Sequence, residues 1–215
     1  MYRPRRSVVG LLAVSVLLAL SVSGCASEPT GTSSPAGTTA QVTQPDSAGK
    51  DVKTIYVAGG CFWGVEKYIG LVNGVVDTEA GYANGANDSA TYGDGSGYAE
   101  AVKVDYDPEV APLPFLLDLL YDAIEPTSVN RRGNDVGTEY RTGIYYTDPA
   151  DEAVIEQSLA QLQKKYPQPI AVESAPLTNY TPAEEYHQDY LKKDPGGYCH
   201  IPQKLFDAAA AARPE

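Results

Sequence analysis

A five-residue run, Gly-Cys-Phe-Trp-Gly at residues 60–64, combines a cysteine with the chain's single tryptophan between two glycines. A β-like stretch at residues 54–58 precedes it, and a helical pattern follows. The run therefore predicts a strand, a tight turn and a helix, with Cys61 at the helix N-terminus. Unpaired backbone N–H groups and the helix dipole favour an anionic sulfur there, and Phe62 and Trp63 would form an apolar wall beside it.

The N-terminal residues have the pattern of an export signal. Three arginines fall within the first six residues, an apolar stretch covers residues 8–20, and Val-Ser-Gly-Cys ends at Cys25. This tetrapeptide resembles the lipobox of bacterial lipoproteins, so residues 1–24 are expected to be a signal peptide and Cys25 the lipidated first residue. The alternative is an ordinary signal peptide with an incidental cysteine. The lipobox interpretation predicts an exported protein, anchored to the outer face of the bacterial cytoplasmic membrane or elsewhere in the cell envelope.

Composition divides the rest of the chain. Residues 25–50 are rich in Ser, Thr, Pro, Gly and Ala. Such a segment cannot bury enough apolar surface to offset the conformational entropy lost on folding, so this composition predicts a lipid-anchored flexible linker. Residues 51–207 suffice for one catalytic domain with its own core, and residues 208–215 form a tail.

Charge argues against one class of partner. The formal net charge of the chain is −12, and removal of the signal arginines leaves 13 basic and 28 acidic residues, or −15. An acidic surface of this size disfavours nucleic acid binding.

Two cysteines remain once Cys25 is assigned to lipid, and in an exported protein Cys61 and Cys199 would by default form a structural disulfide. A zinc site is not expected, because the two histidines, His187 and His200, do not provide the usual ligand spacing. No bound metal or cofactor is predicted.

Strands alternate with helices in the pattern of the domain, but some neighbouring strands are joined by loops alone. This indicates an α+β fold, a two-layer sandwich of a mixed β-sheet and packed helices with a ferredoxin-like (split βαβ) core. The predicted strands cover residues 54–58, 72–80, 101–106, 141–147 and 170–175, the helices 114–124, 149–166 and 182–192, and the polar loops 83–97 and 130–138.

Four polar residues near strand ends and loops stand out: Tyr82, Glu100, Asp135 and Tyr140. Taken singly, each has an ordinary explanation. A tyrosine usually packs, a glutamate at a strand start is usually solvated, and an aspartate in a Gly-containing loop usually caps a turn.

Five motifs in order change this interpretation, and together they resemble the A-type peptide-methionine sulfoxide reductases over residues 54–199. Two positions depart from the family pattern: Tyr98 stands where the family usually has His, and Glu139 where it usually has Gln. The motifs are Gly-Cys-Phe-Trp-Gly, Gly-Tyr-Ala-Asn-Gly, Gly-Tyr-Ala-Glu, Gly-Asn-Asp-Val-Gly-Thr-Glu-Tyr-Arg and Ala-Glu-Glu-Tyr-His-Gln-Asp-Tyr-Leu.

The resemblance implies reduction of the S epimer of methionine sulfoxide, peptide-bound or free, with a role for each motif. Cys61 is then the nucleophile that becomes a sulfenic acid, and Phe62 and Trp63 hold the substrate methyl group. The sulfoxide oxygen is surrounded by a general acid, two hydroxyl donors and a supporting carboxylate, which are Glu100, Tyr82, Tyr140 and Asp135.

The same resemblance gives Cys199 the role of resolving cysteine, which forms a disulfide with Cys61; a static bridge and an unpaired thiol remain the alternatives. A thioredoxin-like protein outside the cytoplasm, or dithiothreitol in vitro, would be the reductant. The expected partners are oxidised proteins, peptides or free methionine sulfoxide, and the protein is expected to be a monomer. Tyr186 and His187 are expected in a helix, facing the core or bracing the pocket.

Two other functions use the same residues. A thiol–disulfide oxidoreductase would use Cys61 and Cys199, although such enzymes normally have a Cys-x-x-Cys pair. A lipoprotein that only binds a ligand in an aromatic pocket would leave the thiol and the acid without a role.

Overall fold

The computed structural model describes residues 51–214. The predicted signal peptide, Cys25 and the rest of the linker to residue 50 lie outside the described residues. No helix within the described range is long and apolar enough to cross a membrane. The elements of the described range are β1 (Lys53–Gly59), α1 (Phe62–Gly70), β2 (Val75–Ala83), β3 (Ala99–Tyr106), α2 (Leu113–Ala123), β4 (Arg131–Arg132), β5 (Asp135–Val136), η1 (Thr138–Tyr140), β6 (Thr142–Tyr146), α3 (Pro149–Gln163), β7 (Glu173–Pro176), β8 (Tyr180–Pro182), α4 (Tyr190–Lys193) and α5 (Gln203–Ala211).

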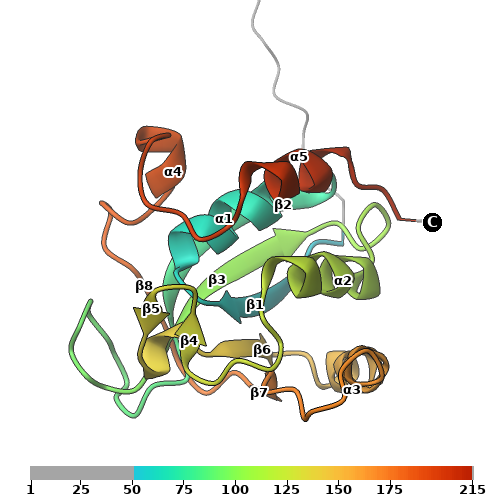
Figure 1. The fold of residues 1–215 in the computed structure, drawn as a ribbon, viewed down its shortest axis with the longest axis horizontal. Coiled ribbons are helices and arrows are strands. Elements are labelled where there is room, and N and C mark those ends of the chain that lie inside the picture. Colours follow the sequence, from blue (N-terminus) through green and yellow to red (C-terminus); the bar gives the residue numbers. More distant parts are fainter. Residues whose placement is uncertain (1–50, 215) are drawn as a thin grey trace, which may run out of the picture. The chain divides into compact units, whose positions relative to one another are not determined.

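The main sheet has the strand order β7-β6-β1-β3-β2-β8 (Figure 1). Strand β3 lies between β1 and β2 and is antiparallel to both, and β1 lies in the same way between β3 and β6. Helices α1 and α2 make the two crossover connections, so the predicted ferredoxin-like core is confirmed. Strand β7 adds to β6 in parallel, which makes the sheet mixed.

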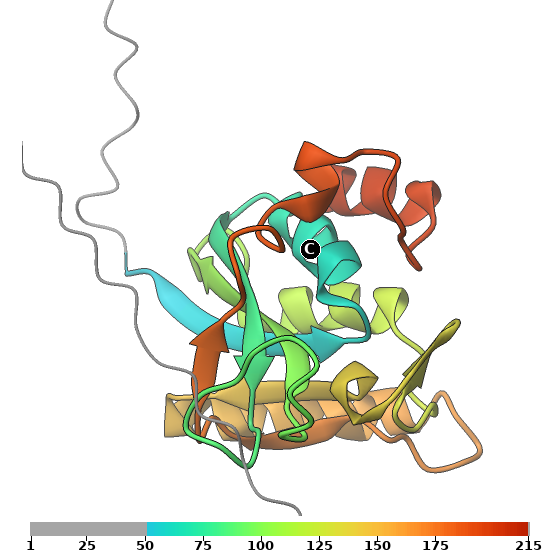
Figure 2. The same cartoon turned by 90° about the vertical axis from the view of Figure 1, so that its left-hand side faces the viewer.

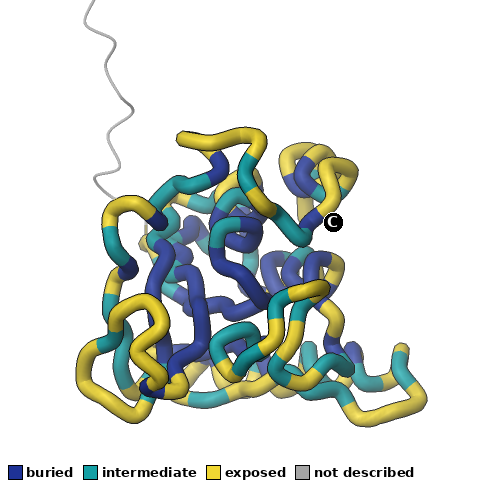
Figure 3. Tube along the Cα trace, turned by 60° about the vertical axis from the view of Figure 1, so that its left-hand side comes forward, coloured by how far each residue is buried: buried dark blue, intermediate teal, exposed yellow. Residues whose placement is uncertain are grey.

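The two faces of the sheet are covered differently. Successive side chains of a strand point to opposite faces, and Ile55 and Val57 of β1 accordingly pack with the helices, whereas Tyr56 and Ala58 belong to a separate cluster. That second cluster is covered by Leu177 and its neighbours rather than by a helix. The result is the predicted two-layer arrangement, with a buried centre and exposed loops at its margins (Figure 3).

The site depends on where β1 ends. Gly60 has a φ of +91°, a conformation that favours glycine, and turns the chain directly into α1, with Cys61 as the N-cap residue. In the neighbouring strand, the pairing of Val57 with Val102 places Glu100 beside the end of β1. The predicted strand, turn and helix are therefore confirmed, and they bring Cys61 close to Glu100.

The helix predicted for residues 182–192 is wrong. Pro182 belongs to β8, where it pairs with Gly81 of β2, and α4 has only four residues. Between them the chain forms turns, because the Gln188 side chain bonds both the N–H and the carbonyl of Ala80, at 2.9 and 2.8 Å. Asp189 then adopts a φ of +51°, which interrupts a helix. Tertiary hydrogen bonds here override the helical pattern.

The C-terminal segment returns across the helical layer. Helix α5 continues to Ala211, past the predicted start of the tail at residue 208, and Phe206 and Ala209 are buried in the core. Both views of the ribbon show α5 over α1 (Figures 1 and 2). This packing brings the preceding segment, which contains Cys199, onto α1.

Candidate active site

A cavity of about 270 Å³ opens at the N-terminus of α1. Its walls come from five separate parts of the chain that the fold brings together: the start of α1, the loop between β2 and β3, strand β3, the segment from β5 to η1, and the segment before α5. The lining residues are Cys61, Phe62, Trp63, Tyr92, Glu100, Asp135, Tyr140 and Tyr198.

Cys61 is a buried free thiol at this cavity, 7% exposed. Burial raises the pKa of the thiol, the adjacent Glu100 carboxyl raises that pKa further, and the backbone N–H of Trp63 lowers it. Burial is the largest effect, so the expected preference for an anionic sulfur at the helix N-terminus is wrong for the free enzyme. Cys61 is a neutral thiol at neutral pH.

Glu100 is the buried acid of the site, 2% exposed, and its Oε2 accepts a hydrogen bond of 3.0 Å from the backbone N–H of Phe62. Burial raises the pKa of this carboxyl to about 8. The Phe62 N–H lowers that pKa, while the carboxylates of Asp135 and Glu139 raise it. Glu100 therefore carries a proton at neutral pH, as a general acid requires.

Two tyrosine hydroxyls face Glu100 across the cavity. Tyr140 was expected there; Tyr92 was not identified from the sequence. Burial raises the pKa of both phenols, and the Glu100 carboxyl raises both further. The interaction between the two hydroxyls lowers the pKa of Tyr92 and raises that of Tyr140. The sequence did contain a signal for Tyr92, which is a large aromatic residue in a loop of Gly, Asn, Asp and Ser. Such a loop has no hydrophobic core of its own in which the ring could pack, so a functional role was the alternative explanation.

The structure does not bring Tyr82 into the cavity. Its hydroxyl donates a 2.7 Å hydrogen bond to Oε2 of Glu184, and its ring packs against Phe62 and Tyr98 with centroids 5.8 and 4.4 Å apart. Tyr82 is thus buried among these side chains and is not among the residues that line the cavity, whereas Tyr92 is.

Phe62 and Trp63 form the apolar wall that the sequence predicts. The Trp63 indole donates a 2.9 Å hydrogen bond to Nδ1 of His187 and stacks on Tyr190 with ring centroids 3.9 Å apart. His187 is 2% exposed, and burial lowers its pKa, so it is neutral and its Nδ1 accepts. Although it lies in a turn rather than a helix, His187 braces the wall from behind.

Asp135 lies at the cavity in the position expected from the sequence, and its Oδ2 accepts a 2.9 Å hydrogen bond from the Tyr198 hydroxyl. Tyr198 is a second lining residue not identified from the sequence. It immediately precedes Cys199, so this bond connects the Cys199 segment to the cavity.

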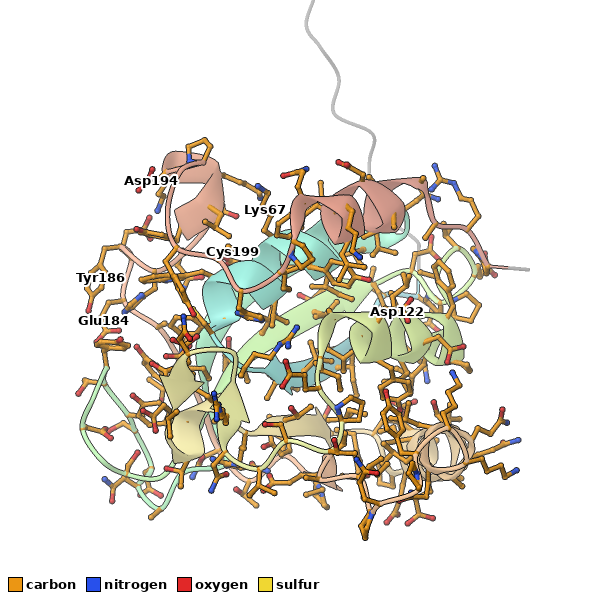
Figure 4. The ribbon with its side chains drawn as sticks, in the orientation of Figure 1. Lys67, Asp122, Glu184, Tyr186, Asp194 and Cys199 are labelled. Carbon is orange, nitrogen blue, oxygen red and sulfur yellow. The ribbon has the colours of Figure 1, made fainter. Side chains whose placement is uncertain are left out.

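Cys199 is a free thiol outside the cavity lining, on the segment that crosses α1 (Figure 4). Its Sγ lies only 3.2 Å from the point that a Cβ at residue 64 would occupy, and the ring of His200 lies 3.3 Å from the same point. Gly64 is three residues beyond Cys61 and therefore lies on the same side of the helix. No static bridge joins the two described cysteines, and Cys199 sits one helical turn from Cys61.

Elsewhere, a groove of about 290 Å³ between α2 and α3 is lined by polar and apolar side chains such as Tyr121, Ser158 and Lys164. Its lining contains no cysteine and no buried acid. The described residues include no cluster of His, Cys, Asp and Glu suited to a metal ion.

The sequence profile of the family described as "Peptide methionine sulfoxide reductase" matches residues 53–213. The chain belongs to this family. It is 53% identical over 164 residues to a peptide methionine sulfoxide reductase MsrA of Lachnoclostridium phytofermentans, covering 74% of this chain and 99% of that relative. It is also 53% identical over 154 residues to an MsrA of Clostridium perfringens, covering 70% and 98%.

Solved structures agree with this membership. The reduced form of Mxr1 from Saccharomyces cerevisiae has a TM-score of 0.66 and 36% identity, covering 70% of this chain and 91% of that one. Methionine sulfoxide reductase A of Corynebacterium diphtheriae has a TM-score of 0.63 and 34% identity, covering 74% and 85%. The protein is thus an enzyme of this family, and the alternatives of a thiol–disulfide oxidoreductase using Cys61 and Cys199 and of a purely ligand-binding lipoprotein are set aside.

Glu100→Gln should change the pH dependence of stability in a defined direction. An unfolded glutamate releases its proton near pH 4.5, whereas the folded site holds the proton until about pH 8. Between these values the folded state binds more protons, so the wild-type free energy of unfolding should fall as pH rises. The variant has no titrating group at residue 100, so its free energy of unfolding should not fall in this way. The free energy of unfolding of the variant minus that of the wild type should therefore increase between pH 4.5 and 8, by the order of a few kcal/mol.

Urea denaturation of both proteins between pH 4.5 and 9 measures the difference. Glu66, a second buried carboxyl with its pKa raised to about 7, is present in both proteins, so its titration cancels. A stability difference that is constant over this pH range would show that Glu100 is ionised in the folded protein.

Proposed function

We propose that this protein reduces the S epimer of methionine sulfoxide, in oxidised proteins and peptides and as the free amino acid, with Cys61 as nucleophile and Glu100 as general acid. The observation that carries the proposal is that a buried thiol and a protonated buried carboxyl line one cavity of about 270 Å³. The same lining supplies an apolar wall, Phe62 and Trp63, for the methyl group of a sulfoxide and the hydroxyls of Tyr92 and Tyr140 for its oxygen.

The cavity can discriminate the substituents of the sulfoxide sulfur. Phe62 and Trp63 take the methyl group through dispersion and sulfur–aromatic contact. The sulfoxide oxygen points to Glu100, with the hydroxyls of Tyr92 and Tyr140 as further donors. The cavity thus fixes the directions of the methyl group, the oxygen and the attacking Cys61 sulfur around the substrate sulfur. With these three directions fixed, only one configuration of the sulfoxide directs the rest of the methionine side chain toward solvent.

The reaction transfers one oxygen atom and balances its protons within the site. The Cys61 sulfur attacks the sulfoxide sulfur as Glu100 gives its proton to the oxygen, which relieves the negative charge that develops there. The Glu100 carboxylate so formed takes the proton lost by the Cys61 thiol. The protonated oxygen then passes to the Cys61 sulfur: its bond to the substrate sulfur and the sulfur–sulfur bond formed in the attack both break, and a sulfur–oxygen bond forms at Cys61. This leaves methionine, now reduced by two electrons, and the Cys61 sulfenic acid.

Cys199 then resolves the sulfenic acid. Its thiol attacks the Cys61 sulfur, water leaves, and a disulfide forms that a thioredoxin-like reductant opens by thiol–disulfide exchange. Two observations support this assignment. Residues 194–202 have irregular backbone, and Cys199 packs against Gly64, one helical turn from Cys61. Formation of the disulfide would then require movement of that short segment toward Cys61, and the segment contributes no strand to the sheet.

The N-terminal sequence supports an exported, lipid-anchored form of the enzyme. The basic start, the apolar stretch and the Val-Ser-Gly-Cys sequence support cleavage before Cys25 and lipidation of its sulfur. A linker poor in large apolar residues follows, and the family match begins only at residue 53. The thioredoxin-like reductant and the oxidised substrates are then those found outside the cytoplasm.

An assay with stereochemically defined methionine sulfoxide and dithiothreitol tests the reaction. Methionine should form from the S epimer and not from the R epimer, and Cys61→Ser should abolish it. Glu100→Gln, which cannot deliver a carboxyl proton, should slow a single turnover by about 100-fold or more. Equal use of both epimers, or a wild-type rate in the glutamine variant, would refute these assignments.

Cys199→Ser should separate the two halves of the cycle. The variant should still turn over with dithiothreitol, which reduces a sulfenic acid directly, but should stop after one methionine per enzyme when thioredoxin is the reductant. Sustained turnover of the variant with thioredoxin would exclude Cys199 as the resolving residue.

Mass spectrometry of the mature N-terminus tests the anchor. The proposal expects a diacylated Cys25 as the first residue and release of the full chain from membranes only by detergent. An unmodified N-terminus at another position would indicate an ordinary signal peptide.

A further inference from the structure

The loop between β2 and β3, residues 84–98, carries Tyr92 to the cavity. Its ends are closed by the pairing of Ala83 with Ala99, but most of its residues are exposed (Figure 3). It contains three glycines with φ between +71° and +74°, at residues 93, 95 and 97. Glycine-rich backbone has many accessible conformations, and Tyr92 itself is 51% exposed, so its position must be fixed by specific contacts.

Two side chains outside the tip of the loop bond the backbone at this tyrosine. The N–H of Tyr92 donates to Oε1 of Glu184 at 3.2 Å. The next N–H, of Gly93, donates to the hydroxyl oxygen of Tyr98 at 2.8 Å. Two successive peptide groups are therefore held by side chains from two separate parts of the chain, which fixes the direction in which the Tyr92 side chain leaves the backbone.

Both anchors rest on buried structure. Oε2 of Glu184 accepts the 2.7 Å bond from the Tyr82 hydroxyl, and Tyr82 is 1% exposed. Tyr98 is 4% exposed, and its ring packs on that of Tyr82 with centroids 4.4 Å apart. Figure 4 shows Glu184 at the edge of the molecule that the loop reaches.

Tyr98 also connects the loop to the strand of the acid. It lies two residues before Glu100, immediately ahead of β3, and its ring belongs to the core cluster on the helix-covered face of the sheet. Tyr82, which pairs with Glu100 across the sheet, shares that face. The rigid strand that holds the proton donor therefore also holds the loop that carries Tyr92.

We propose that Tyr98 and Glu184 are positioning residues that hold the Tyr92 hydroxyl over the cavity, with Tyr82 orienting Glu184. This proposal rests on the role of Tyr92 as a hydrogen-bond donor to the sulfoxide oxygen. It gives a defined role to the tyrosine at residue 98, where the family pattern has histidine, because its hydroxyl accepts the Gly93 N–H. A misplaced donor costs rate rather than affinity, because the oxygen gains charge only as the reaction proceeds.

A double-mutant cycle on single-turnover reduction of the S epimer tests the proposal. Tyr92→Phe should slow the reaction by about 100-fold. Tyr98→Phe, which keeps the ring but removes the acceptor, should slow it by about tenfold with little change in KM. In the double variant the Tyr98 change should have no further effect, because the hydroxyl that it positions is gone.

Tyr145→Phe is the matched control. This buried tyrosine also uses its hydroxyl in one hydrogen bond, 2.9 Å to Glu173, but lies on the other face of the sheet, so its loss should leave the rate unchanged. A wild-type rate in Tyr98→Phe, or a double variant slower by the product of the two single effects, would overturn the positioning role. An unchanged rate in Tyr92→Phe would instead overturn the donor role on which it rests.

Discussion

One hydrogen bond, from the backbone N–H of Phe62 to the Glu100 carboxyl, joins the two halves of the catalytic site. The turn after β1 supplies the thiol and the apolar wall, and β3 supplies the acid. Because the donor is a peptide group at the first position of α1, next to Cys61, the bond holds the Glu100 side chain beside the nucleophile. The same bond lowers the pKa of Glu100, but burial raises it more, and the carboxyl keeps its proton.

Neutrality of both reacting groups follows from this geometry. A charged thiolate and a charged carboxylate in one buried cavity would repel each other, and the described residues that line the cavity include no cationic side chain to compensate them. With a thiol and a carboxylic acid the free enzyme buries no net charge at Cys61 and Glu100. Charge separation then arises only during the transfer of oxygen, where the hydroxyls of Tyr92 and Tyr140 can offset it.

The sequence predicted those parts of the structure that depend mainly on neighbouring residues. The glycines around Cys61 predict the turn, and the order of strands and helices predicts the split βαβ core. Tyr92 could not be chosen over Tyr82 in the same way, because the course of a loop with three glycines at positive φ depends on contacts with Glu184 and Tyr98. The predicted helix after β8 failed for a related reason, since a side chain bonding a distant strand has no signature in periodicity. The protonation state of Cys61 could not be predicted from the sequence either, because it depends on the burial of the thiol, and that burial results from the whole fold.

The proposed reaction transfers the substrate oxygen to Cys61 and so reduces the substrate sulfur, with Glu100 as the proton source. The most direct measurement is mass spectrometry of Cys199→Ser after reaction with a peptide containing the S epimer, without any reductant. The expected result is one methionine per enzyme and one added oxygen on the peptide that contains Cys61. Methionine formed without oxidation of Cys61, or oxidation at another residue, would contradict the account.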